Sequence, residues 1–446
     1  MNIYIDHNYS RLPASNDSTI SVQIYNRDGV VAKNGIKPRD DIATIGKPVY
    51  DAIKRLGFQI SDEVMDFLTI SMAVTAADTF IVRDDCFDGW TRDINVSVRV
   101  INPSIWIKNK ENIEKALQFL SGDVWSFDFK KDGMKPPVPF KPVNGRRLIN
   151  LNGLDCISLF SGGLDSAIGV IDLLTDGKKP LLISHSYKGD KAKQEKIAEG
   201  IKSIGSFSRL CTSANPIGRG MQRDITMRTR SLNFLAFAAV GADAVMKANN
   251  YSNISIYVPE NGFISLNAPL TNRRIGSLST RTTHPHFMEM IQSIFDDIGI
   301  KMNFTNPYQF ETKGKMVSKC KDKNTLAQVV DSTVSCSHWK RKHKQCGYCV
   351  PCMIRRASLL RGGIQETITY HQASYANLRN FVKNKKDGRD DIFSVMMAIE
   401  NAKKRNLKAW VLKSGKLKEQ DVSKYENVFF EGLQEVEAFL KKEKLV

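Results

Sequence analysis

The stretch that decides the fold of this chain is Asp155-Cys156-Ile157-Ser158-Leu159-Phe160-Ser161-Gly162-Gly163-Leu164-Asp165-Ser166. An apolar run typical of a strand leads into an SGGxDS loop, and the helix-forming segment 167–174 follows it. A strand that ends in two glycines and opens into a helix directs several free backbone N–H groups at one point, as anion sites at helix N-termini do. The sequence therefore predicts a phosphate-binding loop at the end of a strand.

The carboxylate of Asp165 narrows the class of ligand. A carboxylate repels a bare phosphate, but Mg²⁺ bridges a carboxylate to a polyphosphate. The GxGxxG and Walker A fingerprints are absent, which disfavours dinucleotide binding and P-loop hydrolysis. We expect the loop to bind ATP and Mg²⁺ through Ser161, Gly162, Gly163, Leu164, Asp165 and Ser166. The alternative is an ordinary strand–turn–helix connection with a serine cap.

A cysteine cluster in the second half of the chain is the other strong motif. Its four thiols follow a C-x9-C-x2-C-x2-C spacing and belong to Cys336, Cys346, Cys349 and Cys352. Four thiolates suit a structural Zn²⁺, with an iron–sulfur cluster as the competing interpretation. His338 and His343 lie inside the loop as alternative ligands, although solvated basic-loop residues are the more common case. The CxxCxxC geometry disfavours disulfides.

The SGGxDS loop followed by this cysteine spacing resembles the 7-cyano-7-deazaguanine synthases (QueC), a family of N-type ATP pyrophosphatases with a PP-loop. The resemblance covers about residues 153–365. It implies an α/β fold with a doubly wound parallel sheet of the adenine nucleotide alpha hydrolase-like type and a zinc-binding subdomain with four cysteine ligands. In that family the carboxylate of 7-carboxy-7-deazaguanine is adenylated by ATP with release of pyrophosphate. Ammonia then gives an amide, which is activated again and dehydrated to a nitrile.

Shorter matches to the family imply further site residues. His185 and Tyr187 lie where the family has a strand-end Asp-Tyr-Gly segment, although the acidic residue is missing here, and we expect them to contact the nucleotide. Arg230 opens a segment similar to the family's Arg-Asn-x-x-Phe-Leu helix, and Lys313 matches a family lysine. With Asp165 and Ser166, these two basic residues are the expected catalytic set. Surface salt bridges are the alternative for both.

The segment 259–267 departs from the compact loop of the family. Glu260 and Asn261 carry the acceptor and donor groups that would bind a guanine-like edge, and we expect them to contact the substrate together with Arg230. An Asn-Gly turn with no role in recognition is an equally good interpretation of this segment. The segment 282–285 stands near where the family recognises its base.

Length and charge bound the remaining possibilities. The chain has 446 residues and a formal net charge of +18. This positive charge suits anionic partners such as nucleotides, tRNA or an acidic protein. An ordinary solvated basic face is the alternative interpretation. No apolar run reaches the length of about 18 residues that a membrane span needs. The N-terminus lacks a signal pattern, so we expect a cytoplasmic protein.

The pattern along the chain predicts three parts. For residues 1–145 the pattern predicts an α+β domain. Its strands are expected over 19–25, 95–101 and 124–129, and its helices over 48–56, 61–77 and 112–119. For residues 151–370 the pattern predicts the nucleotide-binding domain. Its strands are expected over 155–160, 180–185, 207–211 and 253–258, and a helix is expected over 224–247. The proline-rich segment 135–143 predicts the linker. Residues 371–446 predict a basic, amphipathic helical extension.

The additional N-terminal domain and C-terminal extension are similar to the enlarged QueC-like proteins of bacterial anti-phage defence systems of the Qat type. This resemblance implies a protein partner encoded nearby and transfer of the activated carboxylate to a protein amine. A tRNA-modifying enzyme of the thiolation or lysidine type is the runner-up interpretation, and a nucleotide-binding assembly protein is the third.

Overall fold

The structure is a computed structural model that describes residues 1–31, 39–141, 148–186, 189–224, 226–270, 281–339, 343–372 and 390–445. Two five-stranded sheets organise the chain, and neighbouring strands in both are parallel. The first has the order β3-β2-β1-β4-β5, with β1 Asn2–Asp6, β2 Thr19–Ile24, β3 Ile42–Ile45, β4 Asp93–Arg99 and β5 Val124–Lys130. The second has the order β10-β9-β6-β7-β8, with β6 Cys156–Leu159, β7 Pro180–His185, β8 Ser208–Thr212, β9 Ile254–Tyr257 and β10 Met302–Thr305.

The first sheet corrects the expectation of an α+β domain for residues 1–145. The three expected strands are present as β2, β4 and β5, but they form one parallel sheet with β1 and β3, which sequence patterning missed. A parallel sheet usually carries helices on both faces, and its strands then read as continuous apolar runs. Here β4 and β5 alternate between buried and more accessible residues, because helices cover one face only. That alternation is the pattern typical of antiparallel strands.

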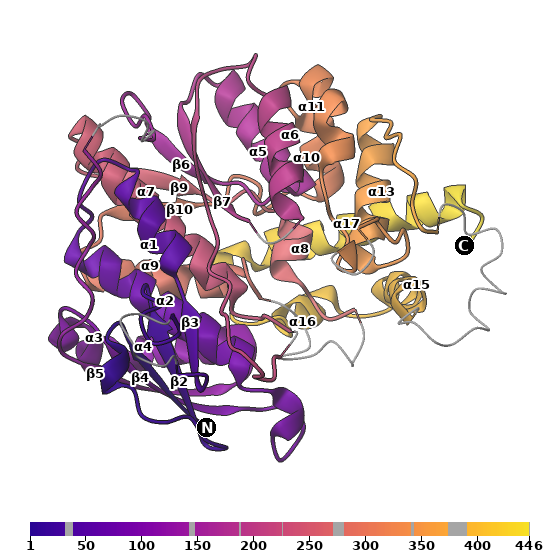
Figure 1. Cartoon of the computed structure of the whole chain (residues 1–446). Coiled ribbons are helices and arrows are strands. Elements are labelled where there is room, and N and C mark those ends of the chain that lie inside the picture. Colours follow the sequence, from indigo (N-terminus) through magenta and orange to yellow (C-terminus); the bar gives the residue numbers. More distant parts are fainter. Residues whose placement is uncertain are drawn as a thin grey trace.

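Two long helices with apolar residues on all sides lie between the two sheets. Helix α2 (Asp62–Phe80) is buried at every position from Val64 onward, as expected for a helix enclosed on all sides. It packs on β2 and β4 of the first sheet and on α7 (Arg230–Asn249), which lies against β6, β7 and β9 of the second sheet. Figure 1 shows this succession from the indigo strands at the bottom to the magenta helices at the top.

Further helices complete the two faces. Helices α1 (Lys47–Lys54), α3 (Pro103–Lys108), α4 (Lys110–Ser121) and α9 (Pro285–Asp297) surround the α2–α7 layer. The opposite face of the second sheet is covered by α5 (Leu164–Thr175), α6 (Asp190–Gly200), α10 (Lys313–Lys319) and α11 (Lys323–Val329). One apolar core cluster runs from Ile3 to Met302 and joins both sheets through this layer.

A buried polar seam joins α2 to the start of α7. Arg92 is fully buried between Asp78 and Asp123, at 2.6 Å from each carboxylate. The second oxygen of Asp78 accepts hydrogen bonds from the backbone and hydroxyl of Thr229, at 2.9 and 2.8 Å. Thr229 is the N-cap of α7, so this contact explains why α7 begins at Arg230 and not at residue 224 as the pattern predicted.

Helix α7 is the one described helix with the length and composition of a membrane span, and 78% of its apolar window is buried inside the protein. Its apolar side chains are therefore accounted for by packing between α2 and the second sheet.

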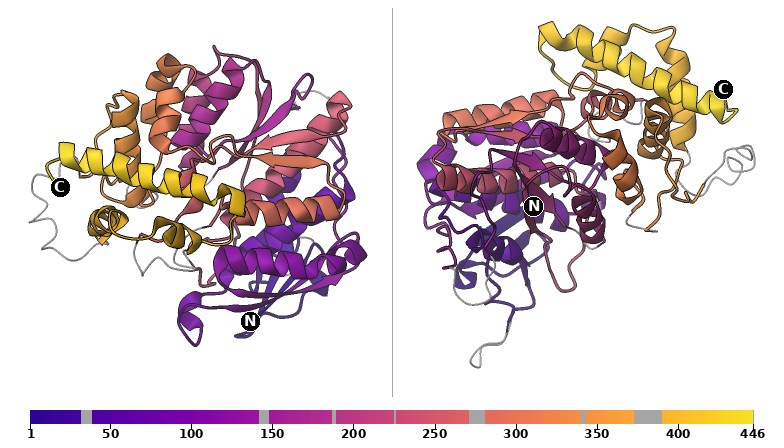
Figure 2. Two further views of the ribbon diagram at one scale, coloured as in Figure 1. Left: turned by 180° about the vertical axis from the view of Figure 1, so that it is seen from behind. Right: turned by 90° about the horizontal axis from the view of Figure 1, so that it is seen from above.

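The C-terminal part is helical, as predicted. It contains α13 (Val350–Gly362), α15 (Asp390–Ala402), α16 (Leu407–Leu412) and α17 (Val422–Lys442), and α8 (Gly262–Leu266) packs among them. The predicted apolar stripe of α17 is buried and consists of Phe429, Leu433, Val436, Phe439 and Leu440. In Figure 2, α17 is the long yellow helix that crosses beside the second half of the chain. Residues 135–141 have no regular structure, as expected of the linker.

Candidate functional site

The SGGxDS loop lies at the topological switch point of the second sheet. β6 pairs with β7 on one side and with β9 on the other, so the connections leaving β6 and β9 run to opposite faces. In open parallel sheets, ligands bind beyond the carboxyl ends of the strands at this point. The SGGxDS loop follows β6, and Pro259, Glu260 and Asn261 follow β9.

The loop has the geometry expected of an anion cradle. Gly162 has a positive φ of 84° and Gly163 serves as the N-cap of α5. No side chain caps this helix, which leaves N–H groups of its first turn for an external acceptor. The hydroxyl of Ser161 accepts from the Gly163 N–H at 3.2 Å and lies 3.2 Å from the hydroxyl of Ser166.

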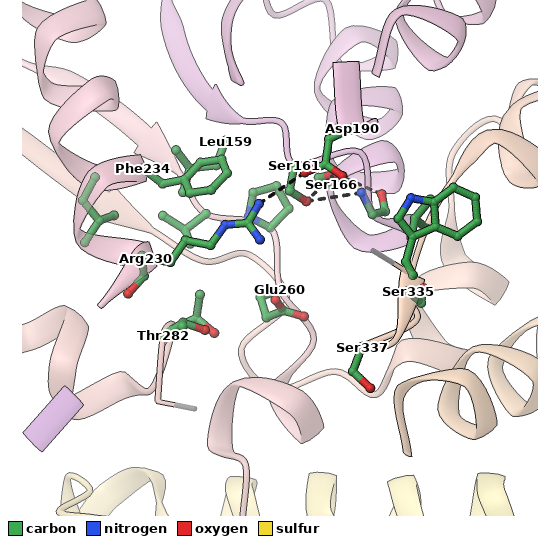
Figure 3. Close-up of a pocket in the computed structure, with 18 of the residues that line it drawn as sticks. Leu159, Ser161, Ser166, Asp190, Arg230, Phe234, Glu260, Thr282, Ser335 and Ser337 are labelled. Carbon is green, nitrogen blue, oxygen red and sulfur yellow. Dashed lines mark hydrogen bonds and ion pairs between the residues drawn. The ribbon is translucent and has the colours of Figure 1, made fainter. Parts of the chain in front are cut away.

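A cavity of about 430 Å³ opens above this loop. Ser161, Gly163 and Ser166 line one wall beside Asp190, and the guanidinium of Arg230 lies 3.6 Å from the Asp190 carboxylate. Figure 3 shows Arg230 reaching toward Asp190 and Ser161, with Glu260 on the other side of the space. An apolar part of the lining comes from Leu159, Phe234, Leu235, Val258, Pro259 and Trp339. A polar end and an apolar body suit a nucleotide or another flat heterocycle with an anionic group.

A buried polar cluster stands behind Glu260. Asp165 is 5% exposed, and its carboxylate lies 3.1 Å from the ammonium of Lys313, which is equally buried. The other oxygen of Asp165 accepts from the side-chain amide of Asn261 at 2.7 Å. Glu260 adjoins this pair and accepts from the side-chain amide of Asn261 at 3.3 Å. The SGGxDS loop, the turn after β9 and the start of α10 thus meet at Asp165.

The two carboxyl groups in this cluster have opposite protonation tendencies. Burial would raise the pKa of Asp165, but the Lys313 ammonium and the hydrogen bonds from Glu260 and Asn261 together hold it below its usual range. Burial and the negative charge of Asp165 raise the pKa of Glu260 well above the ordinary value for glutamate. The cluster therefore favours an ionised Asp165 beside a Glu260 that keeps its proton to higher pH than an ordinary glutamate.

The cysteine cluster is assembled as the spacing predicted. The sulfurs of Cys346 and Cys352 are 3.9 Å apart, and those of Cys336 and Cys349 are 4.0 Å apart. Four sulfurs at about 2.3 Å from one tetrahedral ion lie about 3.8 Å from each other, so this set fits a zinc-sized ion. All eight cysteines fall within the described ranges and are free of disulfides.

His338 adds a fifth donor to this cluster. Its ring nitrogen lies within 4.8 Å of the sulfurs of Cys336, Cys346 and Cys349. The backbone N–H groups of His338 and Cys346 donate to the Cys336 sulfur at 3.3 and 3.2 Å, which stabilises a thiolate there. Cys336, His338, Cys346 and Cys349 are thus a candidate metal centre, with the sulfur of Cys352 3.9 Å from that of Cys346.

The two motifs, far apart in the sequence, lie side by side in the wall of the same cavity. Ser335, Cys336 and Ser337 line it on the side facing the SGGxDS loop. Val334 donates its N–H to the Gly162 carbonyl at 3.0 Å, so the metal-site segment is bonded directly to the loop. Arg355, the arginine after the cluster, is fully buried and donates to Thr333 and Val330, so it holds this segment from behind.

Other predicted site residues lie elsewhere. Leu164 is buried in the core, so only its backbone is available to a ligand. His185 is fully buried against Phe234 and Phe237, accepts from the Ala214 N–H at 3.1 Å, and lies outside the described lining of the cavity. Tyr187 lies outside the described residues.

The predicted substrate residues Glu260 and Asn261 have a different environment from the one expected. Asn261 is fully buried, caps α8 through the Ile264 N–H and donates to Asp165, so its amide is occupied within the protein. Glu260 lines the cavity but accepts from the side-chain amide of Asn261 at 3.3 Å. Of the three predicted substrate residues, Arg230 presents its charged group to the cavity away from the Asp165 cluster.

The segment 281–284 forms a further wall of the cavity. Thr282 lines it, and His284 bonds through its ring to the hydroxyl of Ser414 at 3.1 Å. Arg281 stacks on Phe119 of α4, with 4.4 Å between the guanidinium carbon and the ring centroid. The N-terminal and C-terminal parts of the chain thus both hold this wall, and no local pattern predicted those contacts.

Two lining residues were missed by sequence reasoning. Asp190 opens α6 directly after Gly189, and Trp339 lies within the basic stretch between the first and second cysteines of the cluster. Neither belongs to a recognisable motif. Both enter the cavity because the connection after β7 and the cysteine loop meet the SGGxDS loop in the folded chain.

Comparison with known proteins found no match. No protein-family model matches the sequence, and no curated protein matches it either. The residues and their arrangement are therefore the basis of the proposed function.

Proposed function

We propose that this protein is an ATP-dependent carbon–nitrogen ligase that adenylates the carboxylate of a 7-deazaguanine such as 7-carboxy-7-deazaguanine. The observation that supports this most is the convergence of the SGGxDS loop and the Cys336–Cys352 cluster on one cavity. The resemblance in sequence rests on this pair of motifs, although they are about 170 residues apart. Because they share a cavity, the two motifs can contribute to the same reaction site.

The residues present fit ATP and Mg²⁺. The uncapped start of α5 and the hydroxyl groups of Ser161 and Ser166 suit phosphate oxygens. Asp165 offers the carboxylate oxygens that Mg²⁺ prefers, and one of them has an ion pair but no aligned hydrogen bond. Bound Mg²⁺ would neutralise charge on the departing pyrophosphate.

The proposed reaction requires activation because carboxylates do not react with amines at neutral pH. A carboxylate oxygen of the substrate attacks the α-phosphorus of ATP, and the bond to the β-phosphate oxygen breaks with pyrophosphate taking the electron pair. Backbone N–H groups of the SGGxDS loop stabilise this leaving group, as preorganised donors do for developing anions. Arg230 binds phosphate or carboxylate oxygens from the opposite wall.

The cysteine cluster supports the site in this proposal and takes no part in redox chemistry. A Zn²⁺ held by Cys336, Cys346, Cys349 and Cys352 would fix Ser335 and Ser337 against the cavity. Four thiolates leave no open coordination position on zinc, which favours a structural role. An iron–sulfur cluster at the same cysteines would instead favour the tRNA-thiolating alternative.

The acceptor of the activated carboxylate is proposed by resemblance: ammonia, or an amine on a partner protein of an anti-phage defence system. Incubation with ATP, Mg²⁺ and 7-carboxy-7-deazaguanine, followed by separation of nucleotides, tests the first step. Formation of AMP and pyrophosphate only with the deazaguanine present supports the proposal. Nucleotide binding without turnover would favour an assembly protein, and AMP formation only with tRNA would favour the tRNA-modifying alternative. Mass spectrometry of small and protein-bound products then identifies the acceptor.

A further inference from the structure

Two carboxylates on the C-terminal helix α17 hold the segment that presents Lys313. Glu435 is 8% exposed although it lies on a helix of the C-terminal extension. Its carboxylate accepts from the hydroxyl of Thr312 and, at 3.0 Å, from the backbone N–H of Gly314. These two residues flank Lys313 in sequence, so Glu435 binds the chain on both sides of it.

The fit between α17 and α10 is close enough to depend on a glycine. A Cβ atom at Gly314 would lie 2.5 Å from the carboxyl group of Glu435, so a larger residue there would displace the carboxylate. One helical turn earlier on α17, Glu431 forms an ion pair with Lys315. Arg361 of α13 donates to Glu435 at 2.6 Å and partly balances its charge. The first turn of α10 is thus held by side chains whereas Lys313 itself reaches Asp165.

The same helix also supports the second partner of Asp165. Gly432, between the two glutamates, packs on Phe263 so tightly that a Cβ atom would lie 2.6 Å from that ring. Phe263 belongs to α8, whose N-cap is Asn261. Asn261 and Lys313 therefore reach Asp165 from two elements that rest on one face of α17.

We propose that Glu435 is a positioning residue for the nucleotide site: it fixes Lys313 against Asp165, so that the C-terminal helix α17 is part of the site's construction. This inference rests on the proposed function, in which Lys313 is an expected catalytic residue paired with Asp165. Glu435 lies outside the described lining of the nucleotide cavity, and it acts through its hydrogen bonds to Thr312 and Gly314.

A double-mutant cycle tests the inference in the full-length protein. The variants are Glu435→Gln, Lys313→Met and the combination, with Glu437→Gln as the matched control because Glu437 lies on the same helix and pairs with Lys403 and Lys441. The first measurement is the affinity for ATP with Mg²⁺ by calorimetry. We expect Glu435→Gln to weaken ATP binding about tenfold when Lys313 is present and to change it less than about twofold in the Lys313→Met background, since coupled residues are not additive. Glu437→Gln should leave the affinity unchanged.

The second measurement is the unfolding midpoint in denaturant without nucleotide, for the same variants. Coupling predicts that the combined variant loses less stability than the sum of the two single losses. An equal loss of ATP affinity in both backgrounds would overturn the inference, because Glu435 would then act independently of Lys313. If the wild-type protein fails to bind ATP, the proposed function fails and the stability cycle decides alone: non-additive losses support the positioning role, and additive losses overturn it.

Discussion

The ammonium of Lys313 lies 3.1 Å from the carboxylate of Asp165, and both side chains are only about 5% exposed. Removing one partner of a buried ion pair costs about 3–5 kcal/mol, because the other charge stays buried without compensation. We expect Lys313→Met to lower the free energy of unfolding by that amount at neutral pH. The double variant Asp165→Asn/Lys313→Met should recover much of the loss. Urea unfolding of the four proteins measures this, and equal instability of the single and double variants would contradict the pairing.

The raised pKa of Glu260 predicts a pH dependence of stability. Its pKa is raised in the folded protein above the ordinary value of 4.5, so the folded state binds this proton more tightly than the unfolded state. The corresponding stability is fully present below about pH 4.5 and is lost as pH rises toward the folded pKa, by about 1.4 kcal/mol per pH unit. Glu260→Gln removes this loss, so its stability relative to wild type should increase as pH rises. A constant difference between about pH 4 and pH 8 would be inconsistent with a buried neutral Glu260.

The thiolate cluster predicts dependence of the fold on a metal. We expect elemental analysis to find zinc, and a strong chelator or Cys346→Ser to lower the melting temperature and expose the segment around Ser335 to proteolysis. Cys320→Ser is the matched control, because Cys320 is buried but remote from the cluster. Iron with labile sulfide in place of zinc would point to the thiolation alternative, and an unchanged melting temperature after complete metal removal would refute the structural role.

The polar seam between α2 and α7 predicts that the first sheet stabilises the nucleotide site. Asp78→Ala removes one carboxylate from the fully buried Arg92 and the hydrogen-bond acceptor from Thr229, which directly precedes Arg230. We expect a loss of about 3 kcal/mol in the free energy of unfolding, together with weaker ATP binding. The exposed Asp85 provides the control variant Asp85→Ala. Unchanged stability of Asp78→Ala would mean that Asp123 alone satisfies Arg92.

Local signals explain which parts of the fold were predictable. The strands β6 to β9 are short apolar runs between turn residues, and their positions agree with the sequence prediction to within a residue or two. β1 and β3 were missed because neither has a length or alternation that stands out locally, and only pairing on both sides of β1 reveals its central place. The direction of pairing in the first sheet was likewise inaccessible, since a sheet with one open face produces the alternation of an antiparallel one.

The candidate site also has parts that the sequence predicts and parts that it does not. The SGGxDS segment and the cysteine spacing are local patterns, so the sequence predicted a strand–loop–helix connection and a cluster of thiols, and both are present. Asn261 looked like a residue that binds substrate because its donors and acceptors were counted without their partners. In the structure Asp165 and the start of α8 occupy them. Glu435 carried no signal at all, because its role depends on Gly314, which lies 121 residues away along the chain.

The release of pyrophosphate from ATP in the presence of 7-carboxy-7-deazaguanine tests the central claim most directly. The account predicts AMP and pyrophosphate in equal amounts, dependent on Mg²⁺ and on the deazaguanine carboxylate. Asp165→Asn should abolish the reaction, whereas Glu437→Gln should leave it unchanged. Full activity of Asp165→Asn, or ATP cleavage to ADP and phosphate regardless of the deazaguanine, would contradict the assignment of this site to carboxylate adenylation.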